Sequence, residues 1–175
     1  MKHYLSTAFA LAAVSFFAAC GGRTTTVTES AVTEFETSES TDDGVQRMRE
    51  YHYSDTLRAY GHIYSYTIQR AASDELPRVR DDEGTVYADN VYLLTVECEG
   101  QAFYSRRFVK ADFAASLSEE FRNKALLDGM MCDKSLPGIN FAVSVSLPQS
   151  DMIEPLLLHI YKDGSIAIEK DNRAE

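Results

Sequence analysis

The stretch FAVSVSL, residues 141–147, carries the clearest strand signal in the chain. Its odd-numbered residues are large and apolar, whereas its even-numbered residues are alanine or serine. Because successive side chains of a β-strand point to opposite faces, this alternation predicts a strand with one face in the core. The same period of two recurs on both sides of this stretch.

Segments with this period occur in pairs that short turns join. Three pairs are expected, at residues 54–59 and 64–68 around Gly61, at 91–98 and 102–109 around Glu99-Gly100, and at 156–161 and 165–169 around Asp163-Gly164. An Asp-Gly pair accepts the positive φ of a type I′ turn, so the third pair predicts a two-residue hairpin. The chain is therefore expected to form mainly antiparallel strands.

Residues 111–127 depart from this rhythm. Apolar side chains recur here every fourth residue and share one helical face: Phe113, Leu117, Phe121 and Ala125. Asp112 or Ser118 is a suitable N-cap, and Gly129 is a suitable stop. The segment predicts either one kinked helix or two short ones.

The order of strands, one helical stretch and further strands predicts an α+β fold. We expect an antiparallel, mostly meander sheet of about six to eight strands, curled over one helical segment. An up-and-down β-barrel with the helix as a plug is the alternative. Residues 47–175 form the expected single globular domain, which is long enough to bury roughly two thirds of its unfolded surface.

The N-terminus has the organisation of a bacterial export signal. Lys2 precedes an apolar run over residues 8–19, as in a secretory leader, and Cys20 follows the run. FAAC at residues 17–20 resembles the bacterial lipobox, although that motif usually has leucine where this chain has Phe17. The resemblance implies removal of residues 1–19 and attachment of diacylglycerol and a fatty acid such as palmitate at Cys20. The alternative is a secreted protein or an uncleaved leader with an incidental cysteine.

Residues 20–46 begin at the lipidated cysteine and join it to the expected domain. They are rich in Thr, Ser, Glu and Gly, and they cannot bury enough apolar surface to offset the entropy of ordering. We expect a flexible tether with a reach of about 25–30 Å.

The chain is acidic, with a formal net charge of −10 over 175 residues. Nucleic-acid binders neutralise phosphates with Lys and Arg, so nucleic acid is not an expected partner. The same charge disfavours electrostatic docking on anionic lipid. We therefore expect contact with the lipid bilayer through acylated Cys20, at the outer membrane of the cell envelope, with the periplasmic or surface face left open.

Two further cysteines lie in the expected domain. Cys98 shares strand parity with Tyr92, Leu94 and Val96 and is expected to point into the core, and Cys132 precedes the return strands. An oxidising envelope permits a Cys98–Cys132 disulfide. Two buried free thiols that behave as small apolar side chains are the alternative, which we favour slightly.

No catalytic motif is recognisable, and we expect no catalytic residue, no metal and no cofactor. His159 has strand parity opposite to Leu158 and is expected to be an ordinary strand residue. A Cys132, His159 and Asp151 triad would need the three to meet, which nothing local supports. DDEG at residues 81–84 lacks the alternating ligand spacing of a calcium loop and predicts a solvated turn.

Tyrosines are crowded near the start of the expected domain, namely Tyr51, Tyr53, Tyr60, Tyr64 and Tyr66. Tyrosine is a favoured strand residue, so packing in the sheet and core is the main expectation. The alternative is a recognition surface on which the rings stack against sugars or a protein.

Several short strings resemble a family of small Bacteroidota lipoproteins that is classed only as a domain of unknown function. They are YSYTI at 64–68, LPRV at 76–79, ADN at 88–90, FVKADF at 108–113, VSLPQSD at 145–151 and DGSI at 163–166. The resemblance covers residues 48–172. It implies that the protein is located in the cell envelope, and it implies no particular activity. DTL at 55–57 also resembles the O-glycosylation sequon of that phylum, which implies that Thr56 faces solvent if it carries a glycan.

These observations together predict a membrane-tethered lipoprotein of the cell envelope. A non-enzymatic binding or assembly module of unknown specificity is the first expectation, with envelope proteins or glycans as partners. A small-molecule or lipid-binding envelope protein is the alternative, and it would need a cavity. An uncharacterised hydrolase is the second alternative, and it would need polar side chains that converge in a cleft.

Overall fold

Residues 43–174 are described in the structure, which is a computed structural model. The predicted leader, Cys20 and the first part of the predicted tether lie outside the described residues, so the predictions that fall on them stay predictions. Within residues 43–174, no helix combines the length and the apolar composition that crossing a membrane requires.

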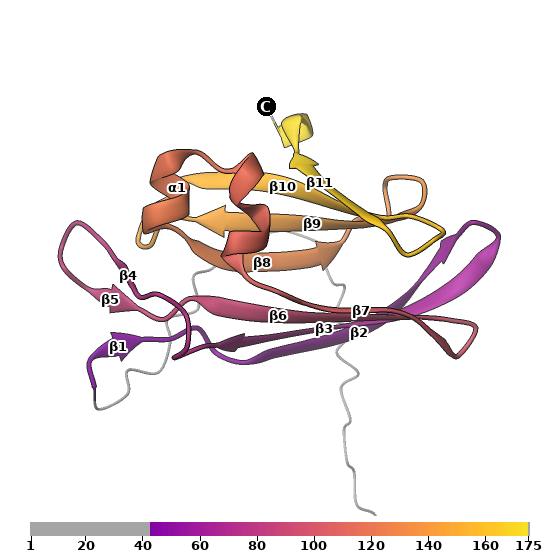
Figure 1. The fold of residues 1–175 in the computed structure, drawn as a ribbon, viewed down its shortest axis with the longest axis horizontal. Helices are drawn as coiled ribbons and strands as arrows, with labels where there is room; N and C mark the ends of the chain where they lie inside the picture. The colour runs from indigo at the N-terminus through magenta and orange to yellow at the C-terminus, as the bar shows by residue number, and fades with distance from the viewer. Residues whose placement is uncertain (1–42, 175) are drawn as a thin grey trace, which may run out of the picture. The chain divides into compact units, whose positions relative to one another are not determined.

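Two four-stranded antiparallel sheets form most of the described fold (Figure 1). Sheet I has the order β2-β3-β6-β7, with bounds Tyr51–Ala59, His62–Ala72, Asn90–Cys98 and Gln101–Phe108. Sheet II has the order β11-β10-β9-β8, with bounds Ile166–Lys170, Ile153–Ile160, Ile139–Ser146 and Leu126–Cys132. Figure 1 shows the two sheets one above the other, with the orange and yellow strands of sheet II uppermost.

The core lies between the inner faces of these sheets, because both contribute to one cluster of buried residues. In β9 and β10 the inward side chains are Ile139, Phe141, Val143, Val145, Leu156, Leu158 and Ile160, each at most 2% exposed. The Tyr66 ring of β3 meets the Phe141 ring edge-on, with 5.5 Å between ring centroids. The alternation predicted for residues 141–147 is thus confirmed, and burial of a side chain such as Phe141 contributes about 1.5–3 kcal/mol.

Two of the three predicted hairpins turn at the predicted residues, each through two residues. Tyr60 and Gly61 join β2 to β3 with φ of 54° and 87°, and Glu99 and Gly100 join β6 to β7 with φ of 51° and 80°. Positive φ at both central residues is the mark of a type I′ turn, whose twist matches that of the flanking strands.

The third hairpin, β10–β11, pairs as predicted, but its predicted two-residue turn is wrong. Of its turn residues only Gly164 has a positive φ, at 80°. The N–H of Tyr161 donates to the carbonyl of Ser165 at 2.8 Å, and the N–H of Gly164 donates to the carbonyl of Tyr161 at 2.9 Å. These bonds leave a three-residue loop that ends in a left-handed glycine.

The predicted helical segment consists of two short helices, η1 (Lys110–Ser116) and α1 (Glu119–Lys124). Ser118 is the N-cap of α1, and its side chain accepts from the N–H of Phe121 at 3.5 Å. The predicted apolar stripe is confirmed, since all four of its residues are buried in the core. The extension of the helix to residue 127 is wrong, because β8 begins at Leu126 and pairs with β9.

The expectation of one antiparallel sheet of about six to eight strands curled over a helix needs correction. The antiparallel pairing is right, but the described residues form eleven strands in three sheets and no closed barrel, and the fold is mainly β. The physical reason is that α1 spans only six residues and offers little apolar surface. Each large sheet therefore buries its inner face against the other sheet.

A small third sheet lies beside α1 and has the order β1-β5-β4, with bounds Val45–Gln46, Val86–Tyr87 and Val79–Arg80. Val79 and Tyr87 pack with Leu126 in a separate buried cluster. The Lys124 ammonium lies 3.1 Å from the Asp82 carboxylate and joins α1 to the β4–β5 turn. These contacts hold the β4–β5 hairpin next to the helical connection.

Candidate functional site

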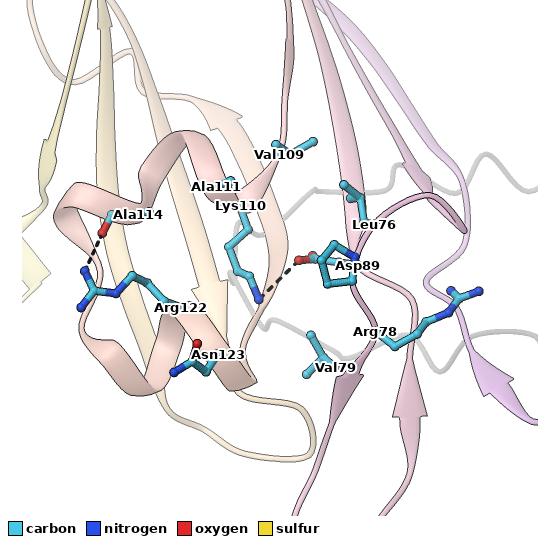
Figure 2. A pocket seen from close by; sticks show the side chains of 11 residues that line it. Leu76, Arg78, Val79, Asp89, Val109, Lys110, Ala111, Ala114, Arg122 and Asn123 are labelled. Carbon is cyan, nitrogen blue, oxygen red and sulfur yellow. Dashed lines mark hydrogen bonds and ion pairs between the residues drawn. The ribbon is translucent and has the colours of Figure 1, made fainter.

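A pocket of about 350 Å³ lies between the segment that leads into β4 and the helices η1 and α1 (Figure 2). Its aliphatic walls come from Leu76, Pro77, Val79, Val109, Ala111 and Ala114. Its polar lining comes from Arg78, Asp89, Lys110, Arg122 and Asn123. The volume is at the lower end of the range of about 300–1,000 Å³ that is typical of small-molecule sites.

Local structure places the two central side chains of this pocket. Phe108 ends β7, and its ring lies 5.8 Å from the ring of Phe113, so the chain turns into η1 with Lys110 as the first helical residue. Asp89 lies in the short link between β5 and β6, and its carbonyl accepts from the N–H of Ser73 at 2.9 Å. Segments far apart in the sequence thus meet at one point.

Lys110 and Asp89 form a buried ion pair at the floor of the pocket, with 3.5 Å between Nζ and Oδ2. Their side chains are only 15% and 5% exposed. The ammonium also donates to the carbonyl of Ala125, at the end of α1. Asp89 Oδ1 accepts from the N–H of Asn90 at 2.8 Å and from the N–H of Leu127 at 2.9 Å.

Burial raises the pKa of the Asp89 carboxyl above its ordinary value, and the Lys110 charge and the two backbone N–H groups only partly oppose this effect. The Asp89 carboxyl therefore has partners on η1, β6 and β8. Burial nevertheless makes its ionised form less favourable than it would be in water. The floor of the pocket is therefore a buried ion pair with hydrogen bonds to three backbone groups.

Two arginines contribute their aliphatic stems to the walls. Arg122 donates to the carbonyl of Ala114 at 3.3 Å, and Arg78 donates to Asp74 at 2.8 Å. In Figure 2 both guanidinium groups point away from Lys110, while the Lys110 ammonium points toward Asp89. The interior of the pocket therefore combines one ion pair with largely aliphatic walls, which suits the binding of an amphipathic molecule.

A second pocket of about 290 Å³ lies near the acidic turn predicted from residues 81–84. Asp81 organises this turn, since its Oδ1 accepts from the N–H of Glu83 and of Thr85, and its Oδ2 accepts from the Tyr87 hydroxyl. Burial by itself raises the pKa of Asp81, but these hydrogen bonds outweigh it and lower the pKa. Among residues 43–174, no group of three or more His, Cys, Asp or Glu side chains is suited to hold a metal ion.

The residues considered for a nucleophilic triad do not come together. Cys132 packs against the core beside Tyr66, whereas His159 lies on the opposite face of sheet II. The ring nitrogens of His159 contact Asn140 Oδ1 at 2.5 Å and Glu169 Oε1 at 3.1 Å, not Asp151. The predicted strand parity of His159 is confirmed, since Leu158 is fully buried on the inner face.

Cys98 and Cys132 are both free thiols in the structure. Each is partly buried and packs against the core, and burial raises the pKa of the Cys132 thiol above its ordinary value. A Cys98–Cys132 disulfide stays a prediction that needs a chemical test.

The tyrosine cluster divides between core and surface. Tyr64 and Tyr66 are 4% and 3% exposed and belong to the core, as the packing expectation required. Tyr51 and Tyr53 are 41% and 43% exposed on the edge strand β2, with parallel rings whose centroids lie 6.3 Å apart. Thr56 is exposed on the same strand, as attachment of a glycan would require. Its glycosylation stays a prediction.

Sequence reasoning did not single out Lys110 or Asp89 as site residues. Three of the strings that carry the family resemblance, at 76–79, 88–90 and 108–113, nevertheless contribute residues to the pocket. A usable signal was the carboxylate of ADN directly before an apolar strand, where an unpaired charge would be costly. Its partner, however, is 21 positions away and cannot be identified from local pattern.

A comparison with curated proteins finds no match to the chain. A family model described as Domain of unknown function (DUF4738) matches residues 30–168. The match covers well over half of the chain, includes the whole pocket and begins within the predicted tether. The resemblance to a domain of unknown function is therefore confirmed, and the chain belongs to the DUF4738 family.

Proposed function

We propose that this protein is a membrane-tethered lipoprotein of the cell envelope whose folded domain is a non-enzymatic binding module. In this proposal acylated Cys20 anchors the protein in the lipid bilayer of the outer membrane, residues 21–42 belong to the tether, and nucleic acid is not a partner. The predicted export signal at residues 1–20 supports the location in the cell envelope, and the pocket beside η1 supports the binding role.

The observation that carries the binding role is the way the pocket floor is held. Lys110 and Asp89 form an ion pair, Lys110 donates to the carbonyl of Ala125, and Asp89 accepts from the N–H groups of Asn90 and Leu127. Groups that are held in this way keep the shape of a pocket before a ligand arrives, which lowers the entropic cost of binding. A preformed pocket with aliphatic walls therefore favours the binding of a ligand.

The volume of the pocket also favours a second candidate, a small-molecule-binding envelope protein. A cavity of about 350 Å³ is large enough for a small organic molecule but too small to enclose a long lipid. The two candidates share the same surface, so one experiment addresses both.

The experiment places a photo-crosslinking amino acid at Ala111, which is exposed and lines the pocket, in the full-length protein in its native envelope. The matched control is Ala115, which is exposed on the same helix but does not line the pocket. We expect an adduct at position 111 that is absent at position 115, and intact mass then separates a protein partner from a small molecule. Equal labelling at both positions, or no adduct at either, contradicts a binding role for the pocket.

A further inference from the structure

The pocket holds one more positive charge than its ion pairs neutralise. Lys110 faces Asp89, and Arg78 is paired with Asp74 at 2.8 Å. Arg122 makes a hydrogen bond with a backbone carbonyl, and no carboxylate among residues 43–174 lies within ion-pair distance of its guanidinium group. In a chain with a net charge of −10, this local surplus favours an anionic ligand.

Hydrogen-bond donors remain for such a ligand. The Lys110 ammonium has three N–H donors, of which one donates to the Ala125 carbonyl. Its distance of 3.5 Å to Asp89 is long for a hydrogen bond, so this ion pair leaves donor capacity unused. The Arg122 guanidinium has five N–H donors and spends one of them on Ala114.

The walls of the pocket determine which chemical group the ligand carries next to its anionic end. Leu76, Val79 and Ala111 are among the aliphatic residues that line the pocket. The stems of Arg78 and Arg122 add further methylene surface, while their charged ends point outward (Figure 2). A ligand that fills this space therefore needs a short apolar body attached to its charged end.

We propose that the pocket binds a small amphipathic monoanion, a carboxylate on a short aliphatic chain. Its carboxylate accepts a hydrogen bond from the Lys110 ammonium, the positive charge of Arg122 at the rim of the pocket adds electrostatic attraction, and its chain lies along the aliphatic walls. One surplus positive charge matches one carboxylate better than a doubly charged phosphate. This inference rests on the proposed function, because it names the ligand class of the same pocket.

The probe is hexanoate, titrated into the purified full-length protein in lipid nanodiscs by calorimetry, with empty nanodiscs subtracted. For a ligand of this size we expect a Kd on the order of 1 mM. Hexanol and hexylammonium have the same chain without the negative charge and are expected to bind at least about tenfold more weakly. Hexyl phosphate distinguishes the carboxylate from a phosphate head and is also expected to bind more weakly.

Two exposed positions provide variants that leave the buried ion pair intact. Ala111→Phe places a ring in the pocket and is expected to weaken hexanoate binding about tenfold or more, whereas Ala115→Phe is expected to leave it unchanged. Arg122→Gln removes the surplus charge and is expected to weaken binding about fivefold. Arg107→Gln removes an exposed arginine of β7 that does not line the pocket, and it serves as the charge-matched control.

Hexanoate that fails to bind, or that binds no better than hexylammonium, overturns the assignment of the ligand class. An Arg122→Gln effect that Arg107→Gln reproduces overturns it as well. These failures are distinct from failure of the proposed function, because photo-crosslinking at position 111 reports any occupant. An adduct at position 111 with no hexanoate binding leaves the binding module standing and refutes only the aliphatic carboxylate.

Discussion

Replacement of Lys110 by methionine tests whether the buried ion pair organises the pocket. Methionine keeps most of the aliphatic stem but removes the ammonium that lies 3.5 Å from Asp89 Oδ2. At an effective dielectric constant of about 20, this charge pair interacts by roughly 5 kcal/mol before desolvation is counted. The variant leaves Asp89 buried without its counter-charge.

Protonation of Asp89 sets an upper limit on the electrostatic cost of Lys110→Met. Protonating a carboxyl of ordinary pKa, about 3.9, costs about 4 kcal/mol at pH 7. Burial already raises the pKa of Asp89, so the limit for this carboxyl is lower. Loss of the hydrogen bond to the Ala125 carbonyl adds about 1 kcal/mol. We expect the free energy of unfolding to fall by about 2–4 kcal/mol at pH 7.

The sign of the pH dependence follows from the raised pKa. A carboxyl whose pKa is higher in the folded state than in the unfolded state makes the folded state bind more protons, so stability falls as the pH rises above about 3.9. Lys110→Met raises the folded-state pKa of Asp89 further. The stability gap between the wild-type protein and the variant is therefore expected to widen between pH 5 and pH 7, by at most about 1.4 kcal/mol per pH unit.

Urea unfolding followed by circular dichroism at both pH values measures this gap. Lys162→Met is the matched control, because the Lys162 ammonium lies 5.0 Å from the centroid of the Tyr60 ring and this contact is expected to contribute about 0.5–1 kcal/mol. The double variant Asp89→Asn/Lys110→Met removes the unpaired charge and is expected to recover part of the loss. A gap of the same size at both pH values would refute the electrostatic argument.

Three further predictions concern the anchor, the β8 bulge and the thiols. Cys20→Ala is expected to move the protein from the membrane fraction to the soluble fraction, whereas Cys98→Ser is expected not to; a Cys20→Ala protein that still pellets after a salt wash contradicts lipid anchoring. Gly129→Ala is expected to cost about 1–3 kcal/mol in urea unfolding, because the added Cβ would lie 2.0 Å from Ser144 Oγ, and Ser144→Ala is expected to relieve part of that cost. Alkylation of the unreduced protein in unfolding urea is expected to modify Cys98 and Cys132, and intact mass that shows neither modified would indicate a disulfide.

The strands with a regular period were predictable because the alternation that identifies each strand lies within its own sequence. A period of two places Phe141, Val143 and Val145 on one face regardless of what covers that face. The same holds for the Ser118 cap and for the apolar stripe between Phe113 and Ala125, since capping and helical spacing depend only on neighbouring residues. The existence of β2, β3, β6, β7, β9, β10 and β11 could therefore be anticipated.

Irregular strands were not predictable in this way. The strands β1, β4 and β5 have two residues each, too few for a period to appear. In β8 the pairing register with β9 shifts between Leu127 and Gly129, so the apolar residues of that segment do not alternate and were read as a helix end. A bulge is a property of two strands together, and one strand alone does not reveal it.

From its own residues the chain specifies which regular segments extend, which face of each is apolar and where the hairpins turn. The division into two stacked sheets and the pocket depend on contacts between distant residues. Lys110 and Asp89 belong to different segments, and burial makes them partners only after β6, β8 and η1 have packed. Local pattern governs backbone conformation, whereas the cost of a buried charge depends on everything that surrounds it.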